Sequence, residues 1–147
     1  MDSIVVGTDG SPNAEGALKQ ATRIAKDRGA RLHLVSAFPD APSFSESIAS
    51  SAKRQPVNLR EVAESVLGRA EAEAESQGVD VMTHARGGDP AQVLLQVAEE
   101  QQADLIVIGA RGLTGFQRFL LGSVSSKLAH HAPCSLMIVR DRQAERA

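Results

Sequence analysis

The stretch of the sequence best suited to chemistry is GARGLTGFQRFLLGS, residues 109–123, which follows an apolar run and precedes an expected helix. Its spacing is Gly109-x2-Gly112-x9-Gly122-Ser123. Glycine has no Cβ, so backbone amides within such a loop can approach an anion closely. The start of a helix adds free amides and about half a positive charge, and Arg111 and Arg118 can add full charges. The stretch predicts a phosphate-binding loop in which Ser123 caps the next helix with its hydroxyl.

This glycine loop differs from the two commonest phosphate-binding motifs. The sequence contains neither G-x-x-x-x-G-K-[ST] nor G-x-G-x-x-G, which excludes a Walker-type loop and the usual dinucleotide fingerprint. The loop is therefore either a phosphate site of another design or a flexible connection whose glycines only serve turns.

A second candidate is the turn GTDGS, residues 7–11, which follows the first apolar run. In open parallel sheets, ligands bind beyond the carboxyl ends of the strands, where the strand order reverses. If the order is 3-2-1-4-5, the first and fourth strands are neighbours. The turn and the glycine loop then lie on either side of one site.

The elements that must position these loops alternate along the chain. Short β-branched apolar runs predict strands at residues 3–8, 31–37, 79–85, 103–110 and 135–140. Apolar residues at helical spacing, between cap and breaker residues, predict four helices. The first begins at Pro12 and ends before Gly29, the second begins at Leu59 and ends before Gly78, the third begins after Asp89, and the fourth covers roughly 123–131. The alternation predicts an α/β fold with an open five-stranded parallel sheet and helices on both faces.

The length of 147 residues predicts a single domain over 1–147. Residues 38–57 hold three prolines and many serines, which indicates a flexible loop; a lid over the strand ends and disorder without function both fit. Asp89 is interpreted as a helix cap and Asp104 as the start of a strand. Neither is expected to follow the carboxyl end of a strand.

Composition excludes several classes of partner. The net charge is -2, and aromatic residues are 3% with no Trp or Tyr, so neither a basic stripe nor a stacking platform for nucleic acid is expected. No apolar run approaches the roughly 20 residues of a membrane span, and the N-terminus lacks a signal-peptide pattern. These features predict a cytoplasmic protein without a membrane or nucleic-acid partner. The single Cys134 agrees with a reducing compartment.

At the glycine loop the chain resembles the universal stress protein family, whose nucleotide-binding members carry G-2x-G-9x-G-[S/T] before their last helix. The resemblance covers nearly the whole chain outside 38–57. Three blocks carry it in their usual order: IVVGTDGSPNAEGAL, GDPAQVLLQVAEEQQADLIVIGARG and LLGSVSSKLAHHAPCSLMIVR. It implies a Rossmann-like sheet of the adenine nucleotide alpha hydrolase type, in the order 3-2-1-4-5.

The resemblance also implies a site for ATP, or another adenine nucleotide, with Mg²⁺. Asp9, with Thr8 and Gly7, would lie near the adenosine and the metal-bound phosphates, although Asp9 could also simply cap the first turn. Ala37 and Ile108 would border the adenine and ribose. The ribose and phosphates would be held by Gly109, Arg111, Gly112, Gly122, Ser123, Val124 and Ser125.

The last strand carries a further implication of the resemblance, a homodimer. An apolar strand at a sheet edge tends to stick to other strands, and symmetric pairing with a second copy removes that tendency; burial within the monomer is the alternative. The residues concerned are Leu136, Met137, Ile138 and Val139.

The resemblance therefore implies a homodimeric ATP-binding stress-response module. Its alternatives are a slow Mg²⁺-dependent ATPase or nucleotidyl-transfer enzyme, and a scaffold dimer without ligand.

Overall fold

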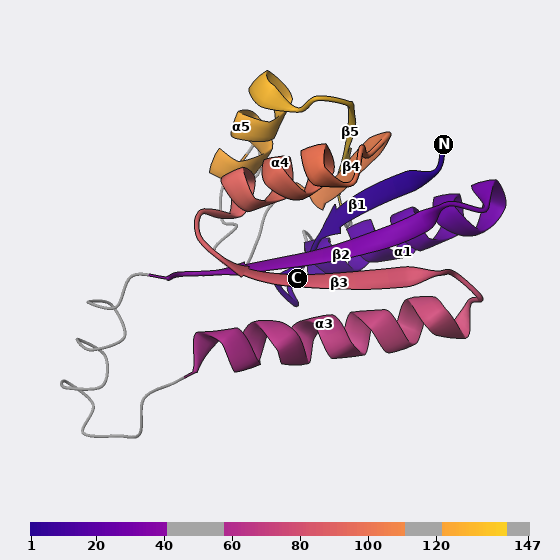
Figure 1. Ribbon diagram of the computed structural model, residues 1–147, viewed down its shortest axis with the longest axis horizontal. Coiled ribbons are helices and arrows are strands. Elements are labelled where there is room, and N and C mark those ends of the chain that lie inside the picture. The colour runs from indigo at the N-terminus through magenta and orange to yellow at the C-terminus, as the bar shows by residue number, and fades with distance from the viewer. Residues whose placement is uncertain (41–57, 111–121, 141–147) are drawn as a thin grey trace.

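A computed structural model describes residues 1–40, 58–110 and 122–140. Five strands and four helices alternate along these residues (Figure 1). The strands are β1 (Ser3–Gly7), β2 (Arg31–Phe38), β3 (Val81–Gly87), β4 (Leu105–Gly109) and β5 (Ser135–Val139). The helices are α1 (Pro12–Arg28), α3 (Leu59–Ser76), α4 (Pro90–Glu100) and α5 (Ser123–His131).

The strands form one sheet in the order β3-β2-β1-β4-β5, and every neighbouring pair is parallel. The first strand of the chain is therefore central, with β2 on one side and β4 on the other. This confirms the α/β class and the predicted strand order 3-2-1-4-5. Because all strands point the same way, the loops that follow β1 and β4 emerge side by side at one edge of the sheet.

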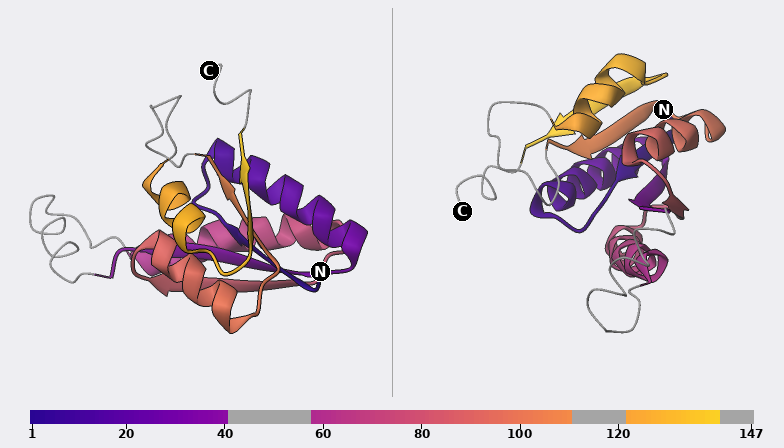
Figure 2. Two further views of the ribbon diagram at one scale, coloured as in Figure 1. Left: turned by 90° about the horizontal axis from the view of Figure 1, so that it is seen from above. Right: turned by 90° about the vertical axis from the view of Figure 1, so that its left-hand side faces the viewer.

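Helices cover both faces of the sheet, as expected (Figures 1 and 2). Alternate side chains of β1 point to opposite faces. Ile4 and Val6 belong to a core with α1 and α3, whereas Val5 belongs to a core with α4 and α5. All three side chains are fully buried, which is why the strand is a continuous apolar run in the sequence.

Both ends of α1 lie where the sequence places them. The Ser11 hydroxyl accepts a hydrogen bond from the Ala14 backbone N–H at 3.3 Å, and Pro12 is the first helical residue. Gly29 ends the helix with φ of 67°, a left-handed conformation that favours glycine. The position of α1, and of the turn before it, is therefore fixed by local chemistry.

The third strand begins and ends two residues later than predicted. Val79 is buried, but its N–H bonds to the Ala74 carbonyl at the end of α3, so it belongs to the turn instead of the ladder. At the other end, the ladder continues until Phe38 of β2 pairs with Gly87. Phe38 is thus a strand residue, and the loop predicted from residue 38 starts later. Residues 41–57, which carry most of that loop, lie outside the described residues.

Within the described part of the chain, no helix is both long enough and apolar enough to cross a membrane.

Candidate functional site

A cavity of about 160 Å³ lies at the carboxyl ends of β1, β2 and β4. This is the point where the strand order reverses, because β1 is followed in sequence by β2 on one side and flanked by β4 on the other. The walls are mainly apolar, and their residues come from three strands, the turn after β1 and three helices: Gly7, Thr8, Asp9, Ser11, Ala14, Val35, Ala37, Pro90, Leu94, Ile108, Gly109 and Val124.

Many residues chosen from the sequence meet at this cavity. Those that line it are Gly7, Thr8, Asp9, Ala37, Ile108, Gly109 and Val124. The cavity also has walls that sequence reasoning did not assign to the site, chiefly Val35, Pro90 and Leu94. The sequence presents Val35 and Leu94 only as buried apolar positions of a strand and a helix, so nothing local to them signals a ligand.

The start of α5 holds Gly122, Ser123 and Ser125 next to the cavity, but their roles differ from the expectation. Gly122 occupies the N-cap position and Ser123 is the first helical residue, with no side-chain hydrogen bond to the cap. The predicted capping by the Ser123 hydroxyl is therefore wrong, because the chain enters the helix one residue earlier. Among the described residues, no side chain caps the first turn of α5, and the amides at a helix start are groups that bind anions in proteins.

The Ser125 side chain has a packing role in this structure. Its hydroxyl is buried and donates to the Ala110 carbonyl oxygen at 3.4 Å. Ala110 itself continues the ladder beyond β4, since its N–H bonds to the Val139 carbonyl at 2.8 Å. The Ser125 hydroxyl therefore links the first turn of α5 to the end of β4 by a hydrogen bond. Arg111 and Gly112 lie outside the described residues.

The turn after β1 is built by its own polar side chains. Asp9 Oδ1 accepts a hydrogen bond from the Ser11 N–H at 2.9 Å, and the Thr8 hydroxyl accepts one from the Gly10 N–H at 3.4 Å. Gly10 has φ of 80°, which a residue with a Cβ adopts rarely. Asp9 therefore caps the turn after β1, which is the alternative role that the sequence allowed for it. Its carboxylate is also exposed to the cavity, so the same residue can meet a ligand.

The two glycines at the strand ends allow close packing around the cavity. A Cβ on Gly109 would lie 2.7 Å from the backbone carbonyl carbon of Asn13, in the first turn of α1. A Cβ on Gly7 would lie 3.2 Å from a methyl group of Leu94 on α4. Gly109 therefore lets α1 approach β4, a role that the anion-binding interpretation did not include.

Asp89 and Asp104 perform the capping and strand-start roles expected of them. Asp89 caps α4 by accepting from the Gln92 N–H at 3.1 Å, and it also pairs with Lys127 of α5 at 3.3 Å. Asp104 accepts hydrogen bonds from the N–H groups of Asp2 and Ser3, and these bonds lower the pKa of its carboxyl group.

The expectation that Asp89 does not follow a strand end is wrong. Because β3 continues to Gly87, Asp89 comes two residues after its carboxyl end. It borders a second cleft between α4 and α5, of about 420 Å³, which shares Val124 with the first cavity.

The donor groups around the cavity suit a nucleotide-bound cation better than a protein cage. Asp9 is the only carboxylate among the described residues that line it. Across the described ranges, no three His, Cys, Asp or Glu side chains gather closely enough to hold a metal ion. Mg²⁺ usually keeps several waters and binds through one or two carboxylates together with substrate phosphates. One carboxylate in the described lining is compatible with a cation held in that form, and Asp9 is the residue that would contact it.

Comparison with known proteins decides the family. The sequence profile of the Universal stress protein family matches residues 1–140. This chain belongs to the universal stress protein family. It is 33% identical over 142 residues to a universal stress protein of Methanocaldococcus jannaschii, covering 97% of this chain and 84% of that one. The resemblance seen in the sequence is therefore confirmed.

Solved universal stress proteins share the fold. One, in complex with cAMP, is 29% identical with a TM-score of 0.69, over 94% of this chain and 95% of that one. Another, from Archaeoglobus fulgidus in complex with dAMP, is 24% identical with a TM-score of 0.69, over 95% of this chain and 98% of that one. The likeness to the second supports the fold alone. Nucleotide binding is thus a property of structural neighbours of this universal stress protein.

Proposed function

We propose that this universal stress protein binds an adenine nucleotide, ATP with Mg²⁺, at the carboxyl ends of β1 and β4. The observation that carries the proposal is the apolar cavity at the reversal of strand order, flanked by a helix start without a side-chain cap. The complex of a structural neighbour with cAMP supports it. In this proposal the protein is a binding module whose contacts depend on nucleotide occupancy.

The apolar walls are suited to the base. Val35 and Ala37 at the end of β2, together with Leu94 of α4, give the cavity apolar walls. The volume of about 160 Å³ is below the roughly 300–1,000 Å³ of pockets that enclose a whole drug-sized ligand. We therefore infer that the cavity encloses the base with part of the ribose, and that the phosphates extend toward the start of α5.

The phosphates and cation would lie between Asp9 and the first turn of α5. Backbone amides at a helix start bind anions without any side-chain charge, and Mg²⁺, when bound, would neutralise the phosphate oxygens. Arg111 and Gly112 remain predicted phosphate contacts. Because Asp9 is the only carboxylate among the described lining residues and already accepts a turn hydrogen bond, we favour binding over ATP hydrolysis or nucleotidyl transfer.

We further propose a homodimer formed through β5. This strand lies at the edge of the sheet, and its residues from Leu136 to Val139 are only half-buried although they are apolar. Their side chains alternate between the two cores, so the monomer covers them in part. Sedimentation at micromolar concentration tests the dimer, and a monomeric mass would contradict it. The cytoplasmic location and the absence of nucleic-acid partners stay predictions from composition.

Calorimetric titration with ATP and AMP tests the main proposal. Replacing Ala37 with Leu places a larger side chain in the cavity, so we expect affinity to fall by about tenfold or more, equivalent to about 1.4 kcal/mol. Ala37→Ser, which nearly keeps the size, is the matched control and should bind within a few-fold of the wild type. No affinity for either nucleotide at millimolar concentration, in a folded protein, would refute the proposal.

A further inference from the structure

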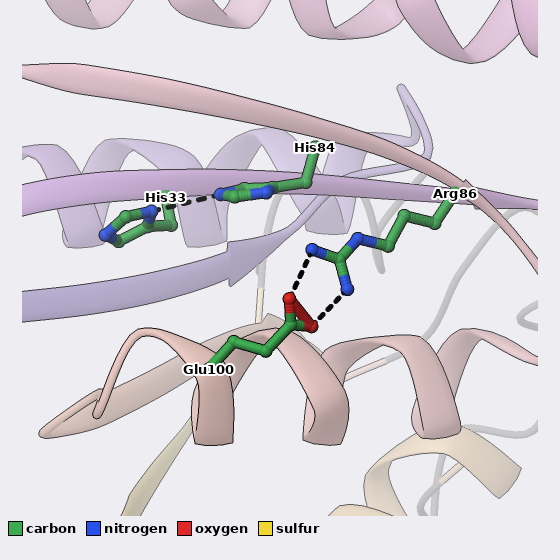
Figure 3. A network of polar contacts seen from close by, with 4 residues as sticks. All are labelled: His33, His84, Arg86 and Glu100. Carbon is green, nitrogen blue, oxygen red and sulfur yellow. Dashed lines mark hydrogen bonds and ion pairs between the residues drawn. The ribbon is translucent and has the colours of Figure 1, made fainter.

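Two histidines and an ion pair form a polar network between the sheet and α4 (Figure 3). His33 of β2 and His84 of β3 face each other, with Nδ1 of the first 3.0 Å from Nε2 of the second. Beside them, Arg86 of β3 forms a bidentate ion pair with Glu100 of α4, and its Nη2 donates to Oε1 at 2.8 Å. The network therefore connects two strands and the helix that covers them.

His33 occupies a position where the fold otherwise uses apolar residues. It is 2% exposed. Val5, its register partner on β1, and Val35, two residues further along β2, both belong to the apolar core against α4. Burial, together with the nearby His84, lowers the pKa of His33 to about 4.

The charged groups around the pair come from β2, β3 and α4. Arg31 of β2 lowers the pKa of His33, while Asp80, just before β3, raises it. For His84, burial is the main cause of a lowered pKa; Arg86 lowers it further and Glu100 opposes the shift. Both imidazoles are therefore neutral near pH 7, and acidification adds charge to a buried position.

The contact between the imidazoles depends on the number of protons it holds. Two neutral rings, or one neutral and one charged ring, share a single N–H···N hydrogen bond. When both rings are charged, each of the facing nitrogens carries a hydrogen, so the acceptor is lost. Two positive charges then face each other at about 3 Å in a partly dry environment, and the contact must open.

The network lies directly beside the wall of the cavity. In the ladder between β2 and β3, Val35 pairs with His84 and Ala37 pairs with Arg86. Both of these β2 residues line the cavity, and so does Pro90, which the chain reaches three residues after β3 ends. The contact between His33 and His84 therefore joins β2, which supplies part of this wall, to the neighbouring strand β3.

We propose that the His33–His84 contact is a proton-sensitive latch between β2 and β3, and that its protonation lowers the affinity of the cavity for nucleotide. This coupling rests on the proposed nucleotide function. It requires that nucleotide prefers the closed, neutral latch. By reciprocity, bound nucleotide must then make the pair harder to protonate.

The test compares ATP affinity at about pH 7.5 and about pH 4, where His33 takes up its proton, in the wild type and in the double variant His33→Gln/His84→Gln. The amides keep a hydrogen bond but do not titrate, and the titration of ATP itself cancels in the comparison. We expect the wild type to lose about fivefold more affinity than the variant, at the low end of usual couplings. The matched control is His130→Gln/His131→Gln, which removes two exposed histidines of α5 and should behave like the wild type.

NMR titration of the wild-type imidazoles with and without ATP gives a second measurement that needs no variant. Bound ATP should lower the pKa values of His33 and His84. Equal pH dependence of ATP affinity in the wild type and a folded double variant, or imidazole pKa values unchanged by bound ATP, would overturn the latch and leave the proposed function intact. Absence of ATP binding at about pH 7.5 would overturn both.

Discussion

Replacing Gly109 with Ala tests whether this glycine is there for packing. The added Cβ would lie 2.7 Å from the carbonyl carbon of Asn13 and 2.8 Å from its oxygen, closer than nonbonded atoms of these types approach. Backbone at the start of a capped helix cannot move aside as a flexible side chain can. We expect a cost of about 2 kcal/mol, within the range of about 1–3 kcal/mol for an overpacked core.

For a chain of this size, that cost lowers the melting temperature by about 4–8 °C. Unfolding in urea, followed by circular dichroism, measures the free energy directly, and one fixed protein concentration is used because any dimerisation makes stability depend on concentration. Nucleotide affinity should fall in parallel, because the displaced start of α1 also borders the cavity.

The matched control is Gly68→Ala on the exposed side of α3. A Cβ at Gly68 meets no atom within 4 Å, and alanine is favoured over glycine within a helix by about 0.5–1 kcal/mol. The control should therefore be slightly more stable than the wild type. If Gly109→Ala unfolded at the same urea concentration as the wild type, the packing explanation would be refuted, and the glycine would have to be explained by its backbone amide alone.

Three further predictions concern stability and use the same urea assay. His33 has a pKa of about 4 in the folded protein against 6.5 in a free side chain, so the unfolded chain binds the extra proton between these values. The free energy of unfolding should reach its full value above about pH 6.5 and fall by about 3 kcal/mol as the pH drops to about 4. A free energy of unfolding that does not change with pH over this window in the wild type would contradict the burial of His33. Ser11→Ala removes the hydroxyl that caps α1 and should cost about 1 kcal/mol, whereas Ser11→Asp, which keeps an acceptor, should cost less; equal losses would argue against capping. Leu128→Ala empties a fully buried position of α5 and should cost about 2–5 kcal/mol, while a loss below about 1 kcal/mol would mean that α5 is held by other contacts.

The sequence predicts the fold of this chain well because its signals are local. The run of residues 105–108 is apolar at every position, as a strand buried on both faces must be. Ser11, Pro12 and Gly29 mark both ends of α1 through their own backbone preferences. Alternating strands and helices then leave few arrangements other than a parallel sheet, since the crossovers are right-handed.

The errors occur where two neighbouring residues can perform the same local task. Gly122 and Ser123 are both acceptable cap residues, and only the path of the chain into α5 selects Gly122. Val79 is as apolar as a strand residue, yet it is buried by the turn that closes α3. Periodicity alone does not separate these cases.

The lining of the candidate site could be predicted from the sequence where it consists of strand ends. Residues such as Gly7 and Ile108 follow from the fold, because parallel strands end at one edge. The contact of Gly109 with Asn13 and the pairing of His33 with His84 both join segments distant in sequence. Their partners depend on register and helix placement, and one sequence contains no signal for either.

The central place of β1 has a consequence for how the chain is made. As the ribosome releases the protein, β1 emerges first, and β2 follows after a single helix to cover one of its sides. Its other side must wait for β4, which is synthesised only after α3, β3 and α4. During that interval the nascent polypeptide presents unpaired backbone along an apolar strand, a surface prone to aggregation. The half-finished chain therefore has an unpaired side of β1 that the complete sheet no longer exposes.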